Sequence, residues 1–229
     1  MNSEEILINV TPQETRVAIV ENGALQEVCI ERRRNRGIVG NIYKGKVNRV
    51  LPGMEAAFID IGLERSGFLH VSDFDLGRVE EVDAEAPPPP AINQLLHEGQ
   101  SVLVQVVKDP LGTKGARLTT SISVPSRYLV YMPNSAMIGI SVKIEEEQER
   151  CRLRELLKAC MEGHQTGGCI VRTAAEGVED AELNRDIKFL CSLWDSVLEY
   201  SKTAKPGSVI HEDLPLAIRT LRDMVGTTT

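Results

Sequence analysis

The sequence predicts an α+β protein made of several subdomains, one of which is a small β-barrel. Three observations support this fold class. Short β-rich runs recur between glycines across residues 37–72, as in small barrels. Apolar residues then recur at three- and four-residue steps across 145–161 and 179–200, which is the period of a helix with one buried face. A chain of 229 residues is long enough for two or three domains.

The first elements along the chain are three predicted strands at residues 5–10, 16–20 and 24–31. Asn22 and Gly23 separate the last two strands, and this pair favours a two-residue hairpin turn because both residues tolerate a positive φ angle. Three strands in a meander cannot close a core by themselves. We therefore expect them to pack against a segment that comes later in the chain.

The middle of the chain is predicted to combine strands with one helix. Residues 74–98 form a polar insertion with a proline run at 87–90, which we expect to be a mobile or extended loop. Gly167 and Gly168 permit another chain to approach closely. The predicted helix covers 145–161, and the predicted strands cover 101–108, 116–123, 127–132, 138–144 and 169–171.

Two further helices are predicted after these strands. The one near 179–200 carries five apolar residues on one face, namely Leu183, Ile187, Leu190, Trp194 and Val197. After a linker at 203–208, Asp213 is a candidate N-cap for the last helix. Pro215 is tolerated in the first turn of that helix, where no amide hydrogen is needed.

Charge is distributed unevenly along the chain. With 26 basic and 33 acidic residues the net charge is −7, which by itself argues weakly against a nucleic-acid partner. Residues 31–50, however, carry seven basic side chains against Glu31 alone, namely Arg32, Arg33, Arg34, Arg36, Lys44, Lys46 and Arg49. A polyanion responds to such a local field. A solvated charged face would give the same pattern.

Cysteine usage and hydropathy predict a cytoplasmic protein without a membrane anchor. The five cysteines form no Cys-x-x-Cys pair, which fits reduced thiols. Cys160 and His164 lie four residues apart, but two ligands do not make a zinc site, so we expect no metal there. No apolar run is long enough to span a bilayer, and Glu4 and Glu5 precede only a short apolar stretch, unlike a signal peptide.

Two phenylalanines lie on the polar side of predicted strands. Alternation places the apolar residues of 57–61 on one face and Phe58 on the other, and Phe68 shares the polar face of 67–71 with His70. Aromatic residues make up only 4% of the chain. Unpaired bases stack on such rings with roughly 1–3 kcal/mol per base. The alternative is that the 74–98 insertion covers both rings.

Four ordered segments resemble the S1-type RNA-binding OB-fold. They are GKVNRV at 45–50, AFIDIG at 57–62, GFLHVSD at 67–73 and GQSVLVQV at 99–106. Three more stretches are similar to the ribonuclease E/G family in particular, namely RGIVGNIYKG at 36–45, KGARLTT at 114–120 and IVRTA at 170–174. The longer runs 106–120 and 128–134 resemble its ribonuclease G branch. This resemblance covers essentially the whole chain and implies the N-terminal half of such an endoribonuclease.

The resemblance implies four segments. Residues 1–35 would begin an RNase H-like subdomain, into which an S1 OB-fold at 36–119 and a 5′ sensor α+β subdomain at 120–207 are inserted. Residues 208–229 would return to the RNase H-like part, which is short compared with the family. That subdomain is therefore expected to be truncated, with exposed edges.

Site residues are implied in the same way. Phe58, Phe68 and His70 would bind RNA in the S1 barrel, and Lys114 matches a family lysine beside the S1 channel, although it could also be an exposed loop lysine. A 5′-monophosphate would be bound by Arg172 through a two-pronged contact and by the Thr173 hydroxyl.

Two further positions complete the implied phosphate site. Backbone amides near Val130 belong to the family's ring of donors. Val142 stands where ribonuclease E-like members carry an arginine, which predicts weaker discrimination between RNA ends, and Lys143 is its basic neighbour.

Catalysis is expected to lie outside this chain. The family cuts with two aspartates that hold magnesium, and a cysteine pair shares a structural zinc between subunits. Both segments would come later, so we expect no catalytic residue, no cofactor and no zinc-linked dimer here, and self-association remains open. Asp60, Asp73 and Asp109 do not substitute, because no pair of them sits in the family's metal-binding context.

The function implied by the resemblance is binding of single-stranded RNA with sensing of its 5′-monophosphate. It would belong to a magnesium-dependent endoribonuclease of RNA processing and decay, including rRNA processing. Two alternatives stay open. One is a stand-alone, non-catalytic RNA-binding regulator. The other is a translation-associated S1 protein, which would leave residues 120–207 unexplained.

Overall fold

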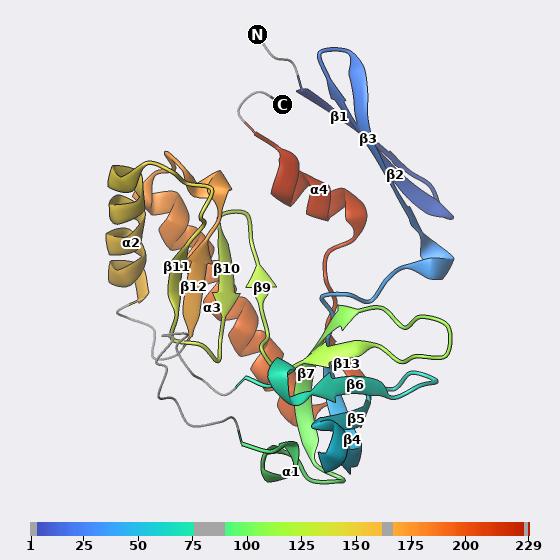
Figure 1. The fold of residues 1–229 in the computed structure, drawn as a ribbon. Coiled ribbons are helices and arrows are strands. Elements are labelled where there is room, and N and C mark those ends of the chain that lie inside the picture. Colours follow the sequence, from blue (N-terminus) through green and yellow to red (C-terminus); the bar gives the residue numbers. More distant parts are fainter. Residues whose placement is uncertain (1–3, 76–89, 162–166, 227–228) are drawn as a thin grey trace. The chain divides into compact units, whose positions relative to one another are not determined.

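A computed structural model of the chain describes residues 4–75, 90–161, 167–226 and 229, and it divides into two compact units. The first unit joins residues 1–37 to residues 213–229, and the second comprises residues 38–212. Figure 1 follows the elements of both units along the chain. The proline run of the insertion lies outside the described residues, except for Pro90.

The first unit contains one antiparallel sheet and one helix. The strands, in the order in which they pair, are β1 (Glu4–Val10), β2 (Glu14–Glu21) and β3 (Ala24–Arg32). Asn22 and Gly23 have φ angles of 50° and 76°, so the predicted hairpin turn is confirmed. Helix α4 (Leu216–Met224) contacts the central strand β2. The first three strands therefore pack against a segment from much later in the chain, as expected.

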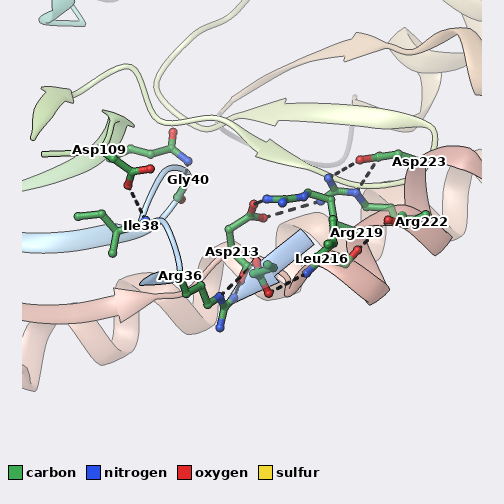
Figure 2. Close-up of polar contacts among 12 residues, drawn as sticks. Arg36, Ile38, Gly40, Asp109, Asp213, Leu216, Arg219, Arg222 and Asp223 are labelled. Atoms are coloured by element: carbon green, nitrogen blue, oxygen red, sulfur yellow. Dashed lines mark hydrogen bonds and ion pairs between the residues drawn. The ribbon is translucent and has the colours of Figure 1, made fainter. Parts of the chain in front are cut away.

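The predicted cap of the last helix is wrong. Helix α4 begins at Leu216, and Pro215 is its N-cap in an extended conformation, so Asp213 lies outside the first turn. The Leu216 amide instead donates to a Glu31 carboxylate oxygen at 3.3 Å. The Asp213 carboxylate lies 3.4 Å from the Arg219 guanidinium (Figure 2). Asp213 therefore stabilises the helix through an arginine side chain rather than through its first amides.

The second unit begins with a closed five-stranded barrel. Its strands pair in the order β4-β5-β6-β8-β7, and β7 pairs back with β4. Their bounds are β4 (Ile42–Leu51), β5 (Ala56–Asp60), β6 (Gly67–His70), β7 (Ser101–Lys108) and β8 (Arg117–Thr119). Val47, Ile59, Leu69, Val104 and Leu118 are buried together in its interior. The predicted small barrel is confirmed, and its closure is consistent with an OB-fold.

Strand β8 is shorter than the predicted strand at 116–123. The Ser121 amide donates to the Thr119 hydroxyl at 3.0 Å, so the chain turns as β8 ends. The Gln105 side chain then hydrogen-bonds to the backbone of Ser123. It accepts from the Ser123 amide and donates to the Ser123 carbonyl, both at 2.9 Å. The polar residues that follow β8 thus form a turn fixed by a side chain.

Strand β13 (Ser208–His211) pairs with β4 on the outside of the barrel sheet. These residues therefore belong to the second unit, and the first unit resumes only at Asp213. Residue 208, where the resemblance implies a return to the RNase H-like part, is the first residue of β13. Gly62 and Gly207 come so close that a Cβ on Gly62 would lie 2.2 Å from the Gly207 carbonyl oxygen.

The remainder of the second unit is a four-stranded sheet with two helices. The strands, in the order β11-β12-β10-β9, are β11 (Ile138–Ile140), β12 (Gly168–Val171), β10 (Leu129–Met132) and β9 (Val124–Pro125). The helices are α2 (Glu147–Met161) and α3 (Asp180–Thr203), which contact each other. The five apolar residues predicted on one face of the second helix are all buried. Both predicted helices are thereby confirmed.

Short helices complete the described chain. Helix α1 (Ile92–Leu95) comes from the end of the insertion, and its Ile92 side chain is buried in the barrel core. Single 3-10 turns cover Arg33–Asn35, Pro52–Met54, Val71–Asp73 and Thr173–Ala175.

The two predicted glycines before β12 are closely packed. Gly167 has a φ angle of +101°, and a Cβ on Gly168 would lie 2.1 Å from the Met137 carbonyl oxygen. The segment that approaches this pair belongs to the same chain, whereas the prediction was an approach by another chain. This contact brings the chain before β11 against the start of β12, and the Cys169 amide donates to the same Met137 carbonyl at 3.0 Å.

A carboxylate links α2 to the loop before α3. Both Glu149 oxygens accept from Arg152 at 2.7 Å, and one also accepts from the Gly177 amide at 2.9 Å. These hydrogen bonds, with those of Arg152 the strongest cause, lower the pKa of Glu149 to about 2. The network fixes the helix pair at its N-terminal ends.

The Glu149→Gln variant is expected to lose stability in a pH-dependent way. Because the folded-state pKa is depressed, the stabilisation is present above the ordinary value near 4.5 and is lost as the pH falls towards about 2. At pH 7 we expect a loss of roughly 1–2 kcal/mol, shrinking to nothing near pH 2. Urea denaturation followed by the fluorescence of Trp194 measures it. The exposed Glu155→Gln serves as the control, and a difference independent of pH would contradict the assignment.

Candidate nucleic-acid interface

The outer side of β5 and β6 carries a pair of aromatic rings. Phe58 and Phe68 lie opposite each other in the β5–β6 pairing, with ring centroids 5.9 Å apart in an edge-to-face arrangement. Both are half-buried, whereas Ala57 and Leu69 beside them are fully buried in the barrel. The prediction that the two rings share the face away from the core is therefore confirmed.

His70 extends this aromatic pair. Its ring lies 6.5 Å from the Phe68 ring, at an angle of 27° between the planes. Its Nδ1 atom lies 2.8 Å from the Ser72 hydroxyl and also accepts from the Ser72 amide at 3.2 Å. Three rings thus follow one another across two strands, and the last of them is fixed by a short turn.

A groove with a volume of about 1220 Å³ opens beside the two phenylalanines. Phe58 and Phe68 line it together with five basic residues, namely Arg49, Arg65, Lys108, Lys114 and Arg117. Cations beside an apolar groove concentrate anions there. The groove therefore combines stacking surfaces with positive charge, as the recognition of an unpaired strand requires.

Not all of these cations are equally available. Arg117 makes a two-pronged contact with Asp73 at 3.0 and 3.1 Å, and Arg65 donates to the Gly112 carbonyl. Lys114 is exposed, and its backbone forms a small bridge with Leu111 that holds the loop beside the groove. Lys114 is thus an exposed cation at the edge of the groove.

The basic stretch predicted at 31–50 is divided between the two units. Its arginines at 32–36 belong to the first unit, and its later members belong to the second. Lys44 donates to the Ser201 and Ala204 carbonyls at 2.7 and 2.9 Å, so it stabilises the C-terminal end of α3. In the second unit the cationic surface therefore depends on residues from the groove, of which only Arg49 comes from that stretch.

The three aspartates considered as metal ligands are each engaged locally. Asp60 accepts from the Gly62 amide at 2.8 Å, Asp73 binds Arg117, and Asp109 accepts from the Ile38 amide at 2.7 Å (Figure 2). Among the described residues, no group of three or more His, Cys, Asp or Glu side chains could hold a metal ion. His164, considered with Cys160, lies outside the described residues.

Three chain segments meet at one end of the four-stranded sheet. Because β11 and β12 are parallel, both finish at this end, and the Ser141 amide donates to the Val171 carbonyl at 2.9 Å. Strand β10 is antiparallel to β12 and therefore starts here, where the Arg172 amide donates to the Tyr128 carbonyl at 2.8 Å. Arg172, Thr173 and Lys143 are brought to the same sheet end.

The side chains at this sheet end differ in their surroundings. Arg172 is half-buried, and its Nη1 atom donates to the Ser126 carbonyl at 2.6 Å. Thr173 is exposed at the start of a 3-10 turn. Lys143 is exposed as well, and Val142 is 88% exposed. A rigid arginine thus lies beside side chains that solvent or a ligand can reach.

Val130 is placed differently from the other predicted phosphate contacts. It lies inside β10, opposite Ile170 of β12 and Pro125 of β9. Val130 is therefore the second residue of β10, the strand that begins at the sheet end with Leu129.

One polar residue of this region was missed by the sequence interpretation. Asp186 is half-buried on α3, and its Oδ2 atom accepts from the Ser126 hydroxyl at 2.5 Å and from the Tyr128 amide at 3.2 Å. A signal was present, because Asp186 lies three residues after Leu183 and four before Leu190, both of which are buried. A carboxylate on the buried face of a helix needs hydrogen-bond donors.

Within the described residues, no helix is both long and apolar enough to cross a membrane.

The chain is similar to known proteins along nearly its whole length. Residues 123–229 match the model of the Ribonuclease E/G family. The chain is 51% identical over 229 residues to Ribonuclease G of Haemophilus influenzae, an alignment that covers 99% of this chain and 46% of that protein. It is 52% identical over 222 residues to Ribonuclease G of Escherichia coli, covering 96% and 45%. It is 37% identical over 220 residues to Ribonuclease E of a Nostoc species, covering 96% and 31%.

The chain spans less than half the length of these relatives. The alignments to the two Ribonuclease G proteins cover nearly all of its own residues, however, and so span both the barrel and the four-stranded sheet. The chain belongs to the ribonuclease E/G family.

Proposed function

We propose that this chain binds single-stranded RNA on its barrel and senses a 5′-monophosphate at the end of the four-stranded sheet, as part of an endoribonuclease of RNA processing and decay. The observation that carries the proposal is the groove that Phe58 and Phe68 line together with five cations. Single-stranded nucleic acids stack their bases on such rings while cations follow the backbone. Because stacking tolerates any base, the sequence preference of this groove should be modest.

Support for phosphate sensing comes from the sheet end. A 5′-monophosphate is a compact anion that favours a guanidinium group. Arg172 donates through Nη1 to the Ser126 carbonyl, which fixes its orientation at 2.6 Å. Exposed Thr173 and Lys143 come from two neighbouring strand ends. This arrangement suits a phosphate terminus better than an uncharged hydroxyl terminus.

We assign binding rather than cleavage to the described residues. The family's cleavage chemistry needs magnesium held by carboxylates. The carboxylates of Asp60, Asp73 and Asp109 are each committed to a neighbouring amide or arginine. Three carboxylates engaged in this way do not fit a magnesium site.

The Arg172→Ala variant is expected to lose the preference for phosphorylated RNA ends. Removing a charged hydrogen-bond donor costs roughly 1.5–3 kcal/mol, so the preference should fall roughly tenfold or more. Fluorescence anisotropy with one short RNA carrying either a 5′-monophosphate or a 5′-hydroxyl measures both affinities. The affinity for the 5′-hydroxyl RNA should stay unchanged, because the barrel is intact.

Arg154→Ala is the matched control for this experiment, since Arg154 is also half-buried but lies on α2. If the unaltered chain binds both RNAs equally, the 5′ sensing proposal is wrong. If it binds neither RNA at low salt, the RNA-binding proposal is wrong as well.

The Lys114→Ala variant is expected to weaken RNA binding uniformly and to reduce its salt dependence. One lost phosphate contact lowers the slope of log K against log salt by roughly 0.7 for a single strand. Affinity measured by anisotropy over a salt series gives this slope directly. Lys158→Ala is the control, because Lys158 is an exposed lysine of α2. An unchanged slope would place Lys114 in the loop without a role in binding.

A further inference from the structure

Asp186 lies where the proposed phosphate site meets helix α3. Its Oδ2 atom accepts from the Ser126 hydroxyl and the Tyr128 amide at 2.5 and 3.2 Å. Both donors belong to the four-residue turn at 126–129 that leads into β10. One carboxylate on a helix therefore binds this turn at two points.

The same turn is closed by its own hydrogen bonds. The Ser126 amide donates to the Leu129 carbonyl at 2.8 Å, and the Leu129 amide lies 3.2 Å from the Ser126 hydroxyl oxygen. Ser126 is buried. Its hydroxyl is thus fixed between the turn and Asp186, so the orientation of the Ser126 carbonyl is set by these contacts.

Arg172 depends on this turn at two points. Its backbone amide donates to the Tyr128 carbonyl at 2.8 Å, and its Nη1 atom donates to the Ser126 carbonyl at 2.6 Å. A guanidinium group held at one nitrogen keeps the donors of the other nitrogens in a fixed plane. A shift of the turn would therefore move the arginine that the proposed function places on the phosphate.

Electrostatics agrees with this arrangement. Burial raises the pKa of Asp186, and the hydrogen bonds from Ser126 and Tyr128 and the charge of Arg172 act in the opposite direction. The Asp186 carboxylate thus interacts with the positive charge of Arg172 as well as with the hydrogen-bond donors of the turn. A carboxylate that faced the phosphate itself would repel it, whereas Oδ2 of Asp186 is occupied by donors of the protein.

We propose that Asp186 is a positioning residue for 5′-phosphate recognition: it holds the turn at 126–129, and this turn orients Arg172. The inference rests on the proposed sensing function. It assigns Asp186 no contact with RNA. A residue of this kind acts on the preference for a phosphorylated end and leaves binding on the barrel unchanged.

The experiment compares Asp186→Ala, Asp186→Asn and Arg172→Ala with the unaltered chain. For each, the ratio of affinities for 5′-monophosphate and 5′-hydroxyl RNA is measured by anisotropy, at a temperature well below its thermal midpoint. Asp186→Ala is expected to lower the ratio roughly tenfold, because it removes hydrogen bonds to a charged group. Asp186→Asn keeps an oxygen that can accept from the Tyr128 amide, so it should restore a large part of the ratio.

Two further variants sharpen the result. Asp195→Ala is the matched control, since Asp195 is an exposed aspartate of the same helix, and it should change nothing. Ser126→Ala removes the 2.5 Å contact from the other side and should lower the ratio in the same direction. It keeps the proposal testable if Asp186→Ala does not fold.

The outcomes are distinct. A ratio unchanged in Asp186→Ala, or one that stays constant while both affinities fall together, would overturn the assignment and leave Asp186 with a structural role only. If Arg172→Ala lowers the ratio and Asp186→Ala does not, the sensing function stands and the positioning role fails. If neither the unaltered chain nor any variant distinguishes the two RNAs, the proposed function itself fails, and the positioning role fails with it.

Discussion

Replacing Phe58 and Phe68 together with alanine is expected to weaken the binding of single-stranded RNA by roughly 2–4 kcal/mol, about 30- to 1,000-fold. Each ring offers one stacking surface, and the two rings touch edge to face at 5.9 Å. The single variants should therefore not add exactly to the double variant, because each loses a partner as well as a base. The barrel should keep its fold, since both rings lie outside its core.

Anisotropy with a 5′-hydroxyl RNA is the measurement of choice, because that RNA does not engage a phosphate site. Phe189→Ala is the matched control: Phe189 is 58% exposed on α3 and lies outside the groove. Circular dichroism confirms that the variants are folded. If the folded double variant binds the 5′-hydroxyl RNA as tightly as the unaltered chain, the assignment of the groove to RNA binding is wrong.

The Gly168→Ala variant is expected to show the largest loss of stability among single substitutions at the sheet end, about 3 kcal/mol or more. The added methyl group would lie 2.1 Å from the Met137 carbonyl oxygen and 2.8 Å from the Ser135 carbonyl oxygen. Both are backbone atoms, so no side chain can rotate away. Either β12 or the segment before β11 has to shift, and with it the strand end that carries Arg172.

Urea denaturation followed by fluorescence measures this loss. Trp194 is the single tryptophan of the chain, and it belongs to the same buried cluster as Cys169, the neighbour of Gly168. Gly53→Ala is the matched control, since a Cβ on Gly53 meets nothing within 4 Å. Equal stability of the two variants would show that the contact at Gly168 relaxes easily.

The barrel could be predicted in detail because neighbouring residues in the sequence already indicate which side chains are buried. Alternation separates Phe58 from Ala57 and Ile59, and the structure places them on opposite faces. Glycines mark close contacts in the same region: a Cβ on Gly45 would meet the Ile59 side chain at 2.4 Å. Local pattern and tertiary packing agree there, as is expected of a sequence that favours one fold.

The sheet end was harder to predict because its contacts join residues far apart in the sequence. Arg172 meets the Ser126 carbonyl across 46 positions, and Asp186 meets the Ser126 hydroxyl across 60. Spacing rules cover three or four residues along a helix and two along a strand, so they cannot supply such pairs. The roles of Arg172, Thr173, Val130 and Lys143 in phosphate binding came from a family resemblance and stay predictions.

Element ends were the remaining source of error. The sequence placed Asp213 at the start of the last helix, whereas the extended backbone of Pro215 delays the helix to Leu216. The Asp213 carboxylate contacts Arg219 and Arg222 of the helix instead of its first amides, and a single-residue capping preference does not include such side-chain partners. The same limitation explains why the strand predicted at 116–123 ends at Thr119.

Because β13 pairs with β4, the second unit begins and ends side by side, with His211 opposite Ile42. During synthesis on the ribosome, β1 to β3 emerge before residues 38–212, and α4, which contacts β2, emerges after them. Once residues 38–212 have folded, their paired ends leave only a few residues of free chain to be closed, so the entropic cost of joining α4 to β2 is small. The first unit is therefore expected to complete its fold after the second unit and quickly once α4 is available, and substitutions that detach β13 should leave the sheet of β1 to β3 exposed to aggregation.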